Sequence, residues 1–297
     1  MSNSSAPSGG TGISPVQLAV LRGRLEQIAD EMDATLFRSA FNPIIAEAHD
    51  ASHGIYDRTT GATVAQGASG LPVFVGSMSG AVSLIIDRTA KEGGPREGDI
   101  WIFNDPYRGG THLNDMKLVQ PFFHDGELFC WLASVGHYTD VGGAVPGNYN
   151  PSAIESAQEG VLIPPIRLVD GGELRSDIVD LVCAISRVPT NAYGDLFGQL
   201  NALKLGVSRL TDLLDEFGAA TVSTGFTELT ARAASLMRSN IAALPDGTYS
   251  IDDFLDNDGS VDEPIQVSLD LTIEGERLVL DFTRTAGAVA GPVNISK

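Results

Sequence analysis

The stretch Asp99–Lys117, DIWIFNDPYRGGTHLNDMK, contains a buried strand and a polar loop, the two features around which the rest of the chain is organised. Its opening run is apolar and β-rich, which predicts a strand over Asp99–Asn104. Acidic, amide and glycine residues follow with neither helix nor strand period, which predicts a loop. A further strand is predicted over Lys117–Phe123. His112 and Asp115 are therefore expected beside strand ends, where functional residues concentrate because a rigid sheet holds them.

Periodicity extends this pattern in both directions. Ser14-Pro15 is typical of a helix start, and apolar residues at helical spacing predict a helix from Pro15 to about Ser39, ahead of Asn42-Pro43. The other elements are predicted in the same way: a hairpin over 51–65 with its turn at 58–61, a helix over 77–92, a strand over 127–135, and helices over 191–217 and 221–244. After residue 245, alternating apolar and polar residues predict an antiparallel sheet with one wet face.

The sequence thus predicts an α+β fold of mixed sheets with packed helices. It divides into a disordered tail at residues 1–13, an N-terminal domain over residues 14–244 and an antiparallel β-rich segment over residues 245–297. The final run, GAVAGPVNISK, is typical of a loop that leads onward. The last segment is therefore interpreted as the start of a truncated second domain.

Composition restricts the classes of function. The chain has 297 residues and a formal net charge of −19, with 38 acidic against 19 basic residues, which disfavours nucleic-acid and anionic-membrane partners. Cys130 and Cys183 lie in apolar runs without a CxxC pattern, so buried free thiols are expected. The polar N-terminus lacks the features of a signal peptide, and no apolar run approaches a membrane span. The expected location is the cytoplasm.

Histidine and aspartate recur in the polar loops. Asp115 follows His112 by three positions, and Asp140 follows His137 by three. A third cluster lies between the first helix and the hairpin and consists of Glu47, His49, Asp50 and His53. Such donors with an open coordination position suit Mn²⁺, Fe²⁺ or Zn²⁺ in a catalytic role. Spacing alone leaves open the alternative that these residues only cap polar turns, and the chain has no GxxxxGK[ST], no helix-opening GxGxxG and no GxSxG motif.

Several long motifs resemble the hydantoinase B (HyuB) family. They are FNPIIAEAHDASHGIYD, GDIWIFNDPYRGGTHLNDMKLVQPFF, GHYTDVGG, EGVLIPPIRLV and PDGTYSIDDFLDNDG. That family includes the B subunit of ATP-dependent N-methylhydantoinases, the C-terminal half of 5-oxoprolinase, and subunits of caprolactamase, acetone carboxylase and acetophenone carboxylase. The resemblance covers the chain from about Ser14 to Asn294. Family members usually continue for a few hundred residues past the GPVN segment, and this chain ends there.

The resemblance implies a metal site in the N-terminal domain. The family pattern places the ligands on an acidic residue after the first helix, on the HxxD pair and on the histidine of GHxxDxGG. The matching positions here are Asp50, His112, Asp115 and His137, while Glu47, His49 and His53 match less securely. The resemblance also makes catalytic candidates of Asp105 and Asp140, as partners that orient ligand histidines, and of Glu159, which belongs to a family motif near the site.

The resemblance further implies a divided reaction in a hetero-oligomer. A HyuA-type partner subunit binds ATP and phosphorylates an oxygen of a small-molecule substrate, and the HyuB-type subunit completes the reaction at its metal. The preferred hypothesis is hydrolysis of a cyclic amide such as a hydantoin, oxoproline or lactam, by generating a hydroxide nucleophile or polarising the electrophile. The alternatives are an ATP-dependent ketone carboxylase and a non-catalytic truncated subunit.

Overall fold

The structure is a computed structural model that describes residues 13–294, so nearly all of the predicted tail lies outside the described residues. The described residues form helices and two antiparallel sheets, which confirms the α+β prediction. The helices are α1 (Pro15–Ser39), α2 (Pro43–Ala46), α3 (Val73–Lys91), α4 (Ser156–Glu159), α5 (Ser176–Ile185), α6 (Pro189–Phe217) and α7 (Ala219–Ala242). The strands are β1 (Ala51–Asp57), β2 (Thr63–Gln66), β3 (Ile100–Phe103), β4 (Asp115–His124), β5 (Glu127–His137), β6 (Ile166–Asp170), β7 (Glu173–Leu174), β8 (Gly247–Leu255), β9 (Ile265–Glu274) and β10 (Arg277–Asp281).

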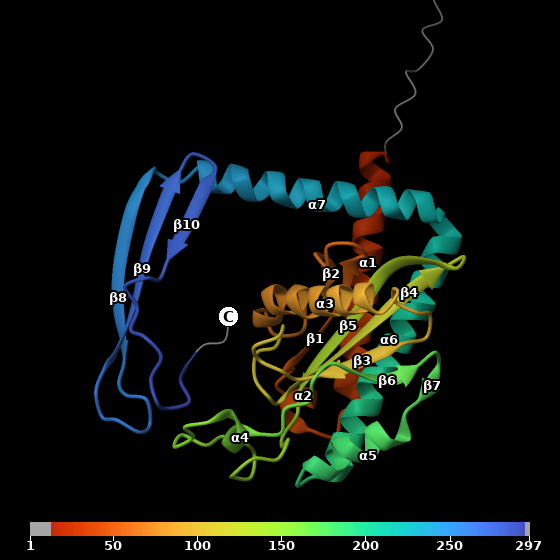
Figure 1. Ribbon diagram of the computed structural model, residues 1–297. Helices are drawn as coiled ribbons and strands as arrows, with labels where there is room; N and C mark the ends of the chain where they lie inside the picture. Colours follow the sequence, from red (N-terminus) through yellow and green to blue (C-terminus); the bar gives the residue numbers. More distant parts are fainter. Residues whose placement is uncertain (1–12, 295–297) are drawn as a thin grey trace, which may run out of the picture.

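The main sheet is antiparallel throughout and has the strand order β2-β1-β5-β4-β3-β6-β7. Helices α1 and α6 pack on one face and α3 packs on the other, so the sheet is the middle layer of three (Figure 1). Because both faces are covered, the central strands are apolar on both sides. Strands β4 and β5 form the longest hairpin, and they lie at the centre of the sheet.

The first helix forms where the sequence predicts it because its N-terminus is capped. The hydroxyl of Ser14 accepts a hydrogen bond from the backbone N–H of Gln17, whose side chain in turn accepts one from the backbone N–H of Ser14. This reciprocal cap satisfies amides that the helix cannot pair internally. The apolar stripe of α1 is buried against the sheet and α6; it includes Leu18, Leu21, Leu25, Ile28, Met32 and Leu36.

The layers enclose two apolar cores. The larger core lies between the sheet and helices α1, α5, α6 and α7, and the smaller one lies between the sheet and α3. Trp101 and Trp131 anchor the smaller core and are each 1% exposed. Aromatic side chains of this size dominate the burial energy of a core. The central strands, whose ends carry the polar loops, are therefore packed against a core on each face of the sheet.

The structure corrects several element boundaries. Helix α3 begins at Val73, earlier than predicted, and strands β4 and β5 extend further into the polar loops, to Asp115 and His137. Helix α5, the short helices α2 and α4, strand β6 and the edge strand β7 were not predicted. Short elements of this kind lack the repeated periodicity on which sequence prediction depends. The extension of β4 and β5 matters most, because it makes both residues part of the sheet.

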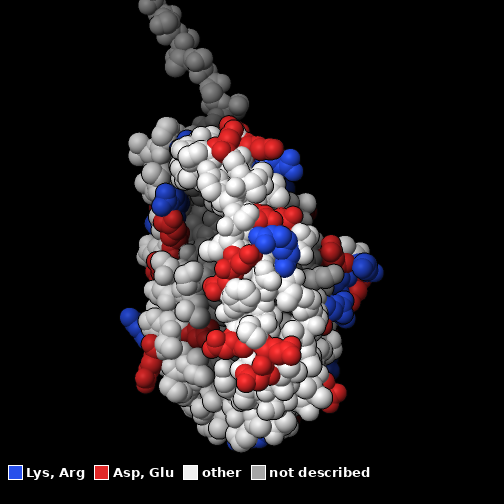
Figure 2. Space-filling view, turned by 90° about the vertical axis from the view of Figure 1, so that its left-hand side faces the viewer, with Lys and Arg blue, Asp and Glu red and all other residues white. Residues whose placement is uncertain are grey.

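Strands β8, β9 and β10 form a second sheet at one side of the molecule, beyond the exposed half of α7 (Figure 1). The predicted alternation is present, but the single wet face is not. Every residue of β8 and β10 is exposed, and β9 buries only Ser268 and Ile273. Figure 2 views the molecule from this side and shows scattered acidic groups on a mostly uncharged surface. The domain boundary near residue 244 stays a prediction.

Helix α3 and the two cysteines test further expectations. Among the described residues, α3 is long and apolar enough to cross a membrane by length and composition, which the sequence prediction missed. Its apolar stripe, including Phe74, Met78 and Ile85, nevertheless packs in the smaller core, as a core helix does. Cys130 and Cys183 are free, and burial raises the pKa of both thiols. The prediction that both thiols are free is confirmed, but only Cys130 is buried, whereas Cys183 is half-buried.

Candidate metal centre

The ends of three adjacent strands, β1, β5 and β4, bring the predicted ligands together at one end of the main sheet. Asp115 is the first residue of β4 and pairs directly with His137, the last residue of β5. Asp50 immediately precedes β1, and its carbonyl accepts a hydrogen bond from the backbone N–H of His137 at 3.0 Å. His112 lies in the loop before β4, and its own carbonyl accepts from the N–H of Asp115 at 3.1 Å. Antiparallel pairing thus gathers segments that are far apart in the sequence.

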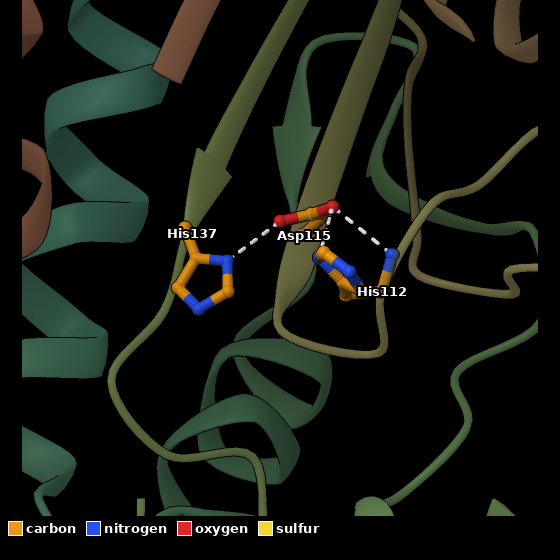
Figure 3. Close-up of side chains that lie close together, drawn as sticks. All are labelled: His112, Asp115 and His137. Carbon is orange, nitrogen blue, oxygen red and sulfur yellow. Dashed lines mark hydrogen bonds and ion pairs between the residues drawn. The ribbon is translucent and has the colours of Figure 1, made fainter. Parts of the chain in front are cut away.

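The side chains of His112, Asp115 and His137 converge (Figure 3). Nδ1 of His137 lies 2.8 Å from Oδ1 of Asp115, and Nδ1 of His112 lies 3.4 Å from Oδ2 of the same carboxylate. One possible ligand atom from each of the three residues lies within 4.8 Å of the other two. Asp50 lies beside this group, with Oδ2 at 3.8 Å from Nδ1 of His137. The predicted set therefore forms a tight group of three residues with a fourth close by.

Burial and charge keep the central carboxylate ionised. The Asp115 side chain is 1% exposed, and burial opposes its ionisation, yet hydrogen bonds from His112 and His137 and the charge of Lys117 hold its pKa far below the usual range. The hydrogen bond to Asp115 raises the pKa of His112. Burial, together with the charge of Asp115, raises the pKa of Asp50. The His112 side chain is 75% exposed, so one side of the group faces solvent.

This donor set fits a divalent transition metal. Two imidazoles and one carboxylate suit Mn²⁺, Fe²⁺ or Zn²⁺ and leave positions for water or substrate. Ligand bonds of about 2.1 Å place neighbouring donor atoms roughly 3 Å apart, which is close to the 2.8 and 3.4 Å separations here. The carboxylate already lacks its proton, so it does not have to release one when a cation binds. Asp50 can add a fourth oxygen from the neighbouring strand.

The three predicted catalytic residues lie elsewhere in the surrounding loops. Asp140 accepts hydrogen bonds from the N–H groups of Gly142 and Gly147 and pairs with Arg187 at 3.0 Å. Asp105 caps the turn at Tyr107, whose N–H it accepts at 3.0 Å. The carboxylate of Glu159 has no hydrogen-bond partner among residues 13–294; only the Glu159 carbonyl accepts one.

Among residues 13–294, none of these three carboxylates has a hydrogen bond or ion pair to His112 or His137, so the expected orientation of the histidines by Asp105 and Asp140 is not observed. The partner of His137 is Asp115 instead. The reason is the register of β4 and β5, which places Asp115 directly opposite His137. A catalytic role for Asp105, Asp140 and Glu159 stays a prediction.

Asp140 is expected to hold its loop in a pH-dependent way. Burial opposes ionisation, but hydrogen bonds from Gly147, Gly142 and Arg187 lower its pKa. A lowered pKa stabilises the folded loop above the ordinary aspartate pKa of about 4, and this stabilisation is lost as the pH falls. Hydrogen exchange should therefore show protection factors for residues 140–148 that fall on acidification. Asp140→Asn should lower them already at neutral pH, while Asp125→Asn, at an exposed turn, should not. Unchanged protection in Asp140→Asn contradicts this prediction.

Among the described residues, the group of converging donors does not include the less secure candidates Glu47, His49 and His53, and Glu47 is exposed. His53 is fully buried, and its ring bridges Asp33 at 2.8 Å and Ser134 at 2.9 Å. His49 stacks on the Phe37 ring with 4.1 Å between centroids. These rings belong to the core and its margin. Of the residues in this cluster, Asp50, at the matching motif position, lies beside the candidate centre, with Oδ2 at 3.8 Å from Nδ1 of His137.

The sequence analysis did not identify the buried polar residues that hydrogen-bond to the backbone around the candidate centre. The side chains of Asn42 and Asn114 donate to the carbonyls of His137 and Tyr138, at 2.6 and 2.7 Å. Lys117 is 0% exposed and lies beside Asp115. The signal available for Lys117 was a lysine inside an otherwise apolar strand, since a buried lysine needs compensation. No local pattern distinguished the two asparagines from turn residues.

The fold and the clustered donors define an α+β protein with a candidate divalent-metal centre at the end of an antiparallel sheet. Comparison of the sequence with family models adds the relationship. The model described as hydantoinase B/oxoprolinase matches residues 14–297. This chain belongs to the hydantoinase B/oxoprolinase family.

Individual relatives agree with that assignment. The chain is 34% identical over 264 residues to caprolactamase subunit beta of Pseudomonas jessenii, covering 89% of this chain and 45% of that protein. A crystal structure of ATP-dependent caprolactamase from the same organism matches 90% of this chain and 46% of the other, with a TM-score of 0.83. The 5-oxoprolinase of Dictyostelium discoideum is 26% identical over 288 residues, covering 96% of this chain and 22% of that protein.

A more distant structure shares only the fold. A nucleotide-free acetone carboxylase structure matches 92% of this chain and 37% of its own, with a TM-score of 0.83 at 20% sequence identity. The family model, which matches residues 14–297, confirms the family relationship inferred from the motifs. The chain spans about half the length of caprolactamase subunit beta and less of the 5-oxoprolinase.

Proposed function

We propose that this chain is the metal-dependent part of an ATP-dependent enzyme that opens cyclic amides. The observation that carries the proposal is the convergence of His112, Asp115 and His137 in a member of the hydantoinase B/oxoprolinase family. Two relatives support the substrate class by name, since a caprolactamase and a 5-oxoprolinase both act on a cyclic amide. The expected partner is a HyuA-type subunit that uses ATP, in a cytoplasmic hetero-oligomer.

The division of labour follows from the chemistry of amides. An amide carbonyl is a poor electrophile, and phosphorylating its oxygen by the partner converts that oxygen into part of a leaving group. A divalent cation at this centre supplies Lewis acidity, either to water or to an oxygen of the substrate. The chain itself has to hold the donors rigidly and leave one side open, which the buried Asp115 and the exposed His112 achieve.

The side chains around the centre have distinct tasks in this proposal. Asp115 contacts the His137 ring through Oδ1 and accepts the backbone N–H of His112 through Oδ2. Asp50, whose pKa is raised by burial, is the fourth donor or the acceptor of a proton from the attacking water. His112 is the donor nearest to solvent and marks the side from which substrate approaches.

Reconstitution with the ATP-using partner tests the proposal. ATP turnover coupled to ring opening is expected with a lactam, 5-oxoproline or a hydantoin. It should be lost after chelation and restored by Mn²⁺, Fe²⁺ or Zn²⁺. A ketone with bicarbonate serves as the competing substrate, because acetone carboxylase shares the fold. Turnover with the ketone and bicarbonate, but with none of the cyclic amides, identifies a carboxylase instead. If the purified chain binds no metal and supports no turnover with any of these substrates, the non-catalytic alternative is favoured.

A further inference from the structure

Gln199 is a buried amide on helix α6, at the face where this helix packs on the main sheet. It is 0% exposed and lies in an apolar stripe with Leu196, Ala202 and Leu203 at helical spacing. Polar atoms in such surroundings are costly to bury unless they are hydrogen-bonded. The partners of this amide therefore show which segments the helix holds in place.

The amide uses both its nitrogen and its oxygen. Nε2 donates to the carbonyl of Met116 at 3.1 Å and to Oγ of Ser134 at 3.0 Å, while Oε1 accepts from the hydroxyl of Tyr138 at 2.9 Å. The carbonyl of Met116 can only accept, so the nitrogen end of the amide has to face it. Gln199 is thereby fixed to strands β4 and β5 and to the residue that follows β5.

Two of these partners are the immediate neighbours of candidate metal ligands. Met116 follows Asp115 at the start of β4, and Tyr138 follows His137 at the end of β5. Among the described residues, the amide hydrogen-bonds to these neighbours and not to the ligand side chains. Gln199 can therefore act on the ligands only through the backbone that carries them.

Gly136 lies between the amide and the strand end that carries His137. A Cβ at this glycine would lie 3.6 Å from Cδ and Nε2 of Gln199 and 3.1 Å from Cδ1 of Ile45, so a side chain larger than a methyl group would displace the amide. Successive side chains of a strand alternate between faces, so Asp115 and His137 leave the sheet on the side away from α6. The amide thus contacts the sheet on the face opposite to the ligands.

A second buried polar group on α6 acts on the same strand end. Asp195, one turn before Gln199, is 1% exposed and accepts the N–H groups of Phe41 and Asn42 at 2.8 and 3.2 Å. The side chain of Asn42 in turn donates to the carbonyl of His137 at 2.6 Å. Residues four apart share one face of a helix. This face of α6 therefore directs two polar groups to the backbone around the candidate centre.

We propose that Gln199 is a positioning residue that clamps the strand ends carrying Asp115 and His137 and so preorganises the donors for the metal. This inference rests on the proposed function, in which the centre binds a divalent cation. Donors that are already in place lose little conformational freedom on binding. Residues that orient the ligands of a metal typically change its affinity about 10- to 100-fold.

Gln199→Met tests the clamp, because methionine keeps the volume and removes all the hydrogen bonds of the amide. With the chain folded by circular dichroism, titration calorimetry should give about ten-fold weaker Mn²⁺ binding than for the wild type. The paramagnetic resonance of bound Mn²⁺ should broaden, because the donors no longer share one geometry. In the metal-free chain, amide hydrogen exchange should accelerate at residues 115–116 and 137–138 and stay unchanged on α3.

Two further variants separate positioning from stability. Tyr138→Phe removes one hydrogen bond of the clamp and should weaken Mn²⁺ binding in the wild type but not in Gln199→Met, where the partner is absent. Asp99→Ala is the matched control, because its buried carboxylate pairs with Arg96 and Arg167 at the opposite end of β3 from the polar loop. It should lower the midpoint of urea denaturation and leave the Mn²⁺ affinity unchanged.

Three outcomes overturn the inference alone. Unchanged Mn²⁺ affinity and resonance in Gln199→Met make Gln199 a packing residue of the core. A Tyr138→Phe effect that is equally large in the Gln199→Met background assigns the two effects to separate causes. Equally weakened binding in Asp99→Ala assigns the loss to global stability. A wild-type chain that binds no Mn²⁺ instead overturns the proposed function together with the inference, so the two failures are distinguishable.

Discussion

Asp115→Ala should lose stoichiometric metal binding, with the affinity for Mn²⁺ reduced at least about 100-fold, more than the 10- to 100-fold typical of residues one shell further out. The reason is geometric as well as electrostatic. Oδ1 lies 2.8 Å from Nδ1 of His137, and Oδ2 accepts the backbone N–H of His112 at 3.0 Å and lies 3.4 Å from Nδ1 of His112, so one carboxylate contacts both histidines. Alanine removes the negatively charged ligand and these contacts to both histidines. Elemental analysis of the purified chain and calorimetric titration with Mn²⁺ measure the loss.

Matched controls make this result specific. Asp125→Asn changes an exposed aspartate at the turn after β4, and His124→Ala removes a histidine outside the group. Both should retain about one equivalent of metal, while His112→Ala should lose most of it. If Asp115→Ala keeps the metal content of the wild type, the three side chains are only a polar turn. If the wild type is also metal-free, the donors do not form a working centre in this chain.

His53→Ala should destabilise the fold strongly without removing a metal ligand. The ring is fully buried and bridges Asp33 and Ser134, at 2.8 and 2.9 Å. Removing it leaves the Asp33 carboxylate buried without a partner, since Oδ2 of Asp33 has none among the described residues. Breaking a buried pair by deleting one member costs about 3–5 kcal/mol. Urea denaturation monitored by circular dichroism should show a loss of this size.

A double-mutant cycle checks the cause. Replacing Asp33 and His53 together should cost less than the sum of the two single changes, because the orphaned partner is then absent. Asp125→Asn, at a side chain that is 92% exposed, should change the free energy of unfolding by less than about 0.5 kcal/mol, as surface changes usually do. Bound metal should stay near one equivalent in the folded fraction of His53→Ala. A mild effect on stability together with lost metal makes His53 a ligand, against the geometry found here.

Local patterns predicted the long elements well. The Ser14 cap, the apolar stripe of α1 and the break before Asn42-Pro43 all act within a few residues, so the sequence places that helix correctly. The hairpin with its turn after Asp57 was predicted for the same reason. The extension of β4 to Asp115 was not predicted, because its polar start resembles a loop until β5 pairs with it. The exposure of the β8–β10 sheet also escaped prediction, because alternation indicates a half-buried sheet but does not supply the covering layer.

For the candidate site, too, some features follow from the sequence and others only from the tertiary structure. The sequence by itself offered candidate metal donors in three polar clusters, and the family resemblance narrowed them to Asp50, His112, Asp115 and His137. Only the tertiary structure decided that they meet, and that His53 turns into the core while Asp140 holds a loop through Arg187. The physical reason is that antiparallel register joins residues distant in the sequence and a strand sends neighbouring side chains to opposite faces, so residue type alone fixes neither partner nor direction.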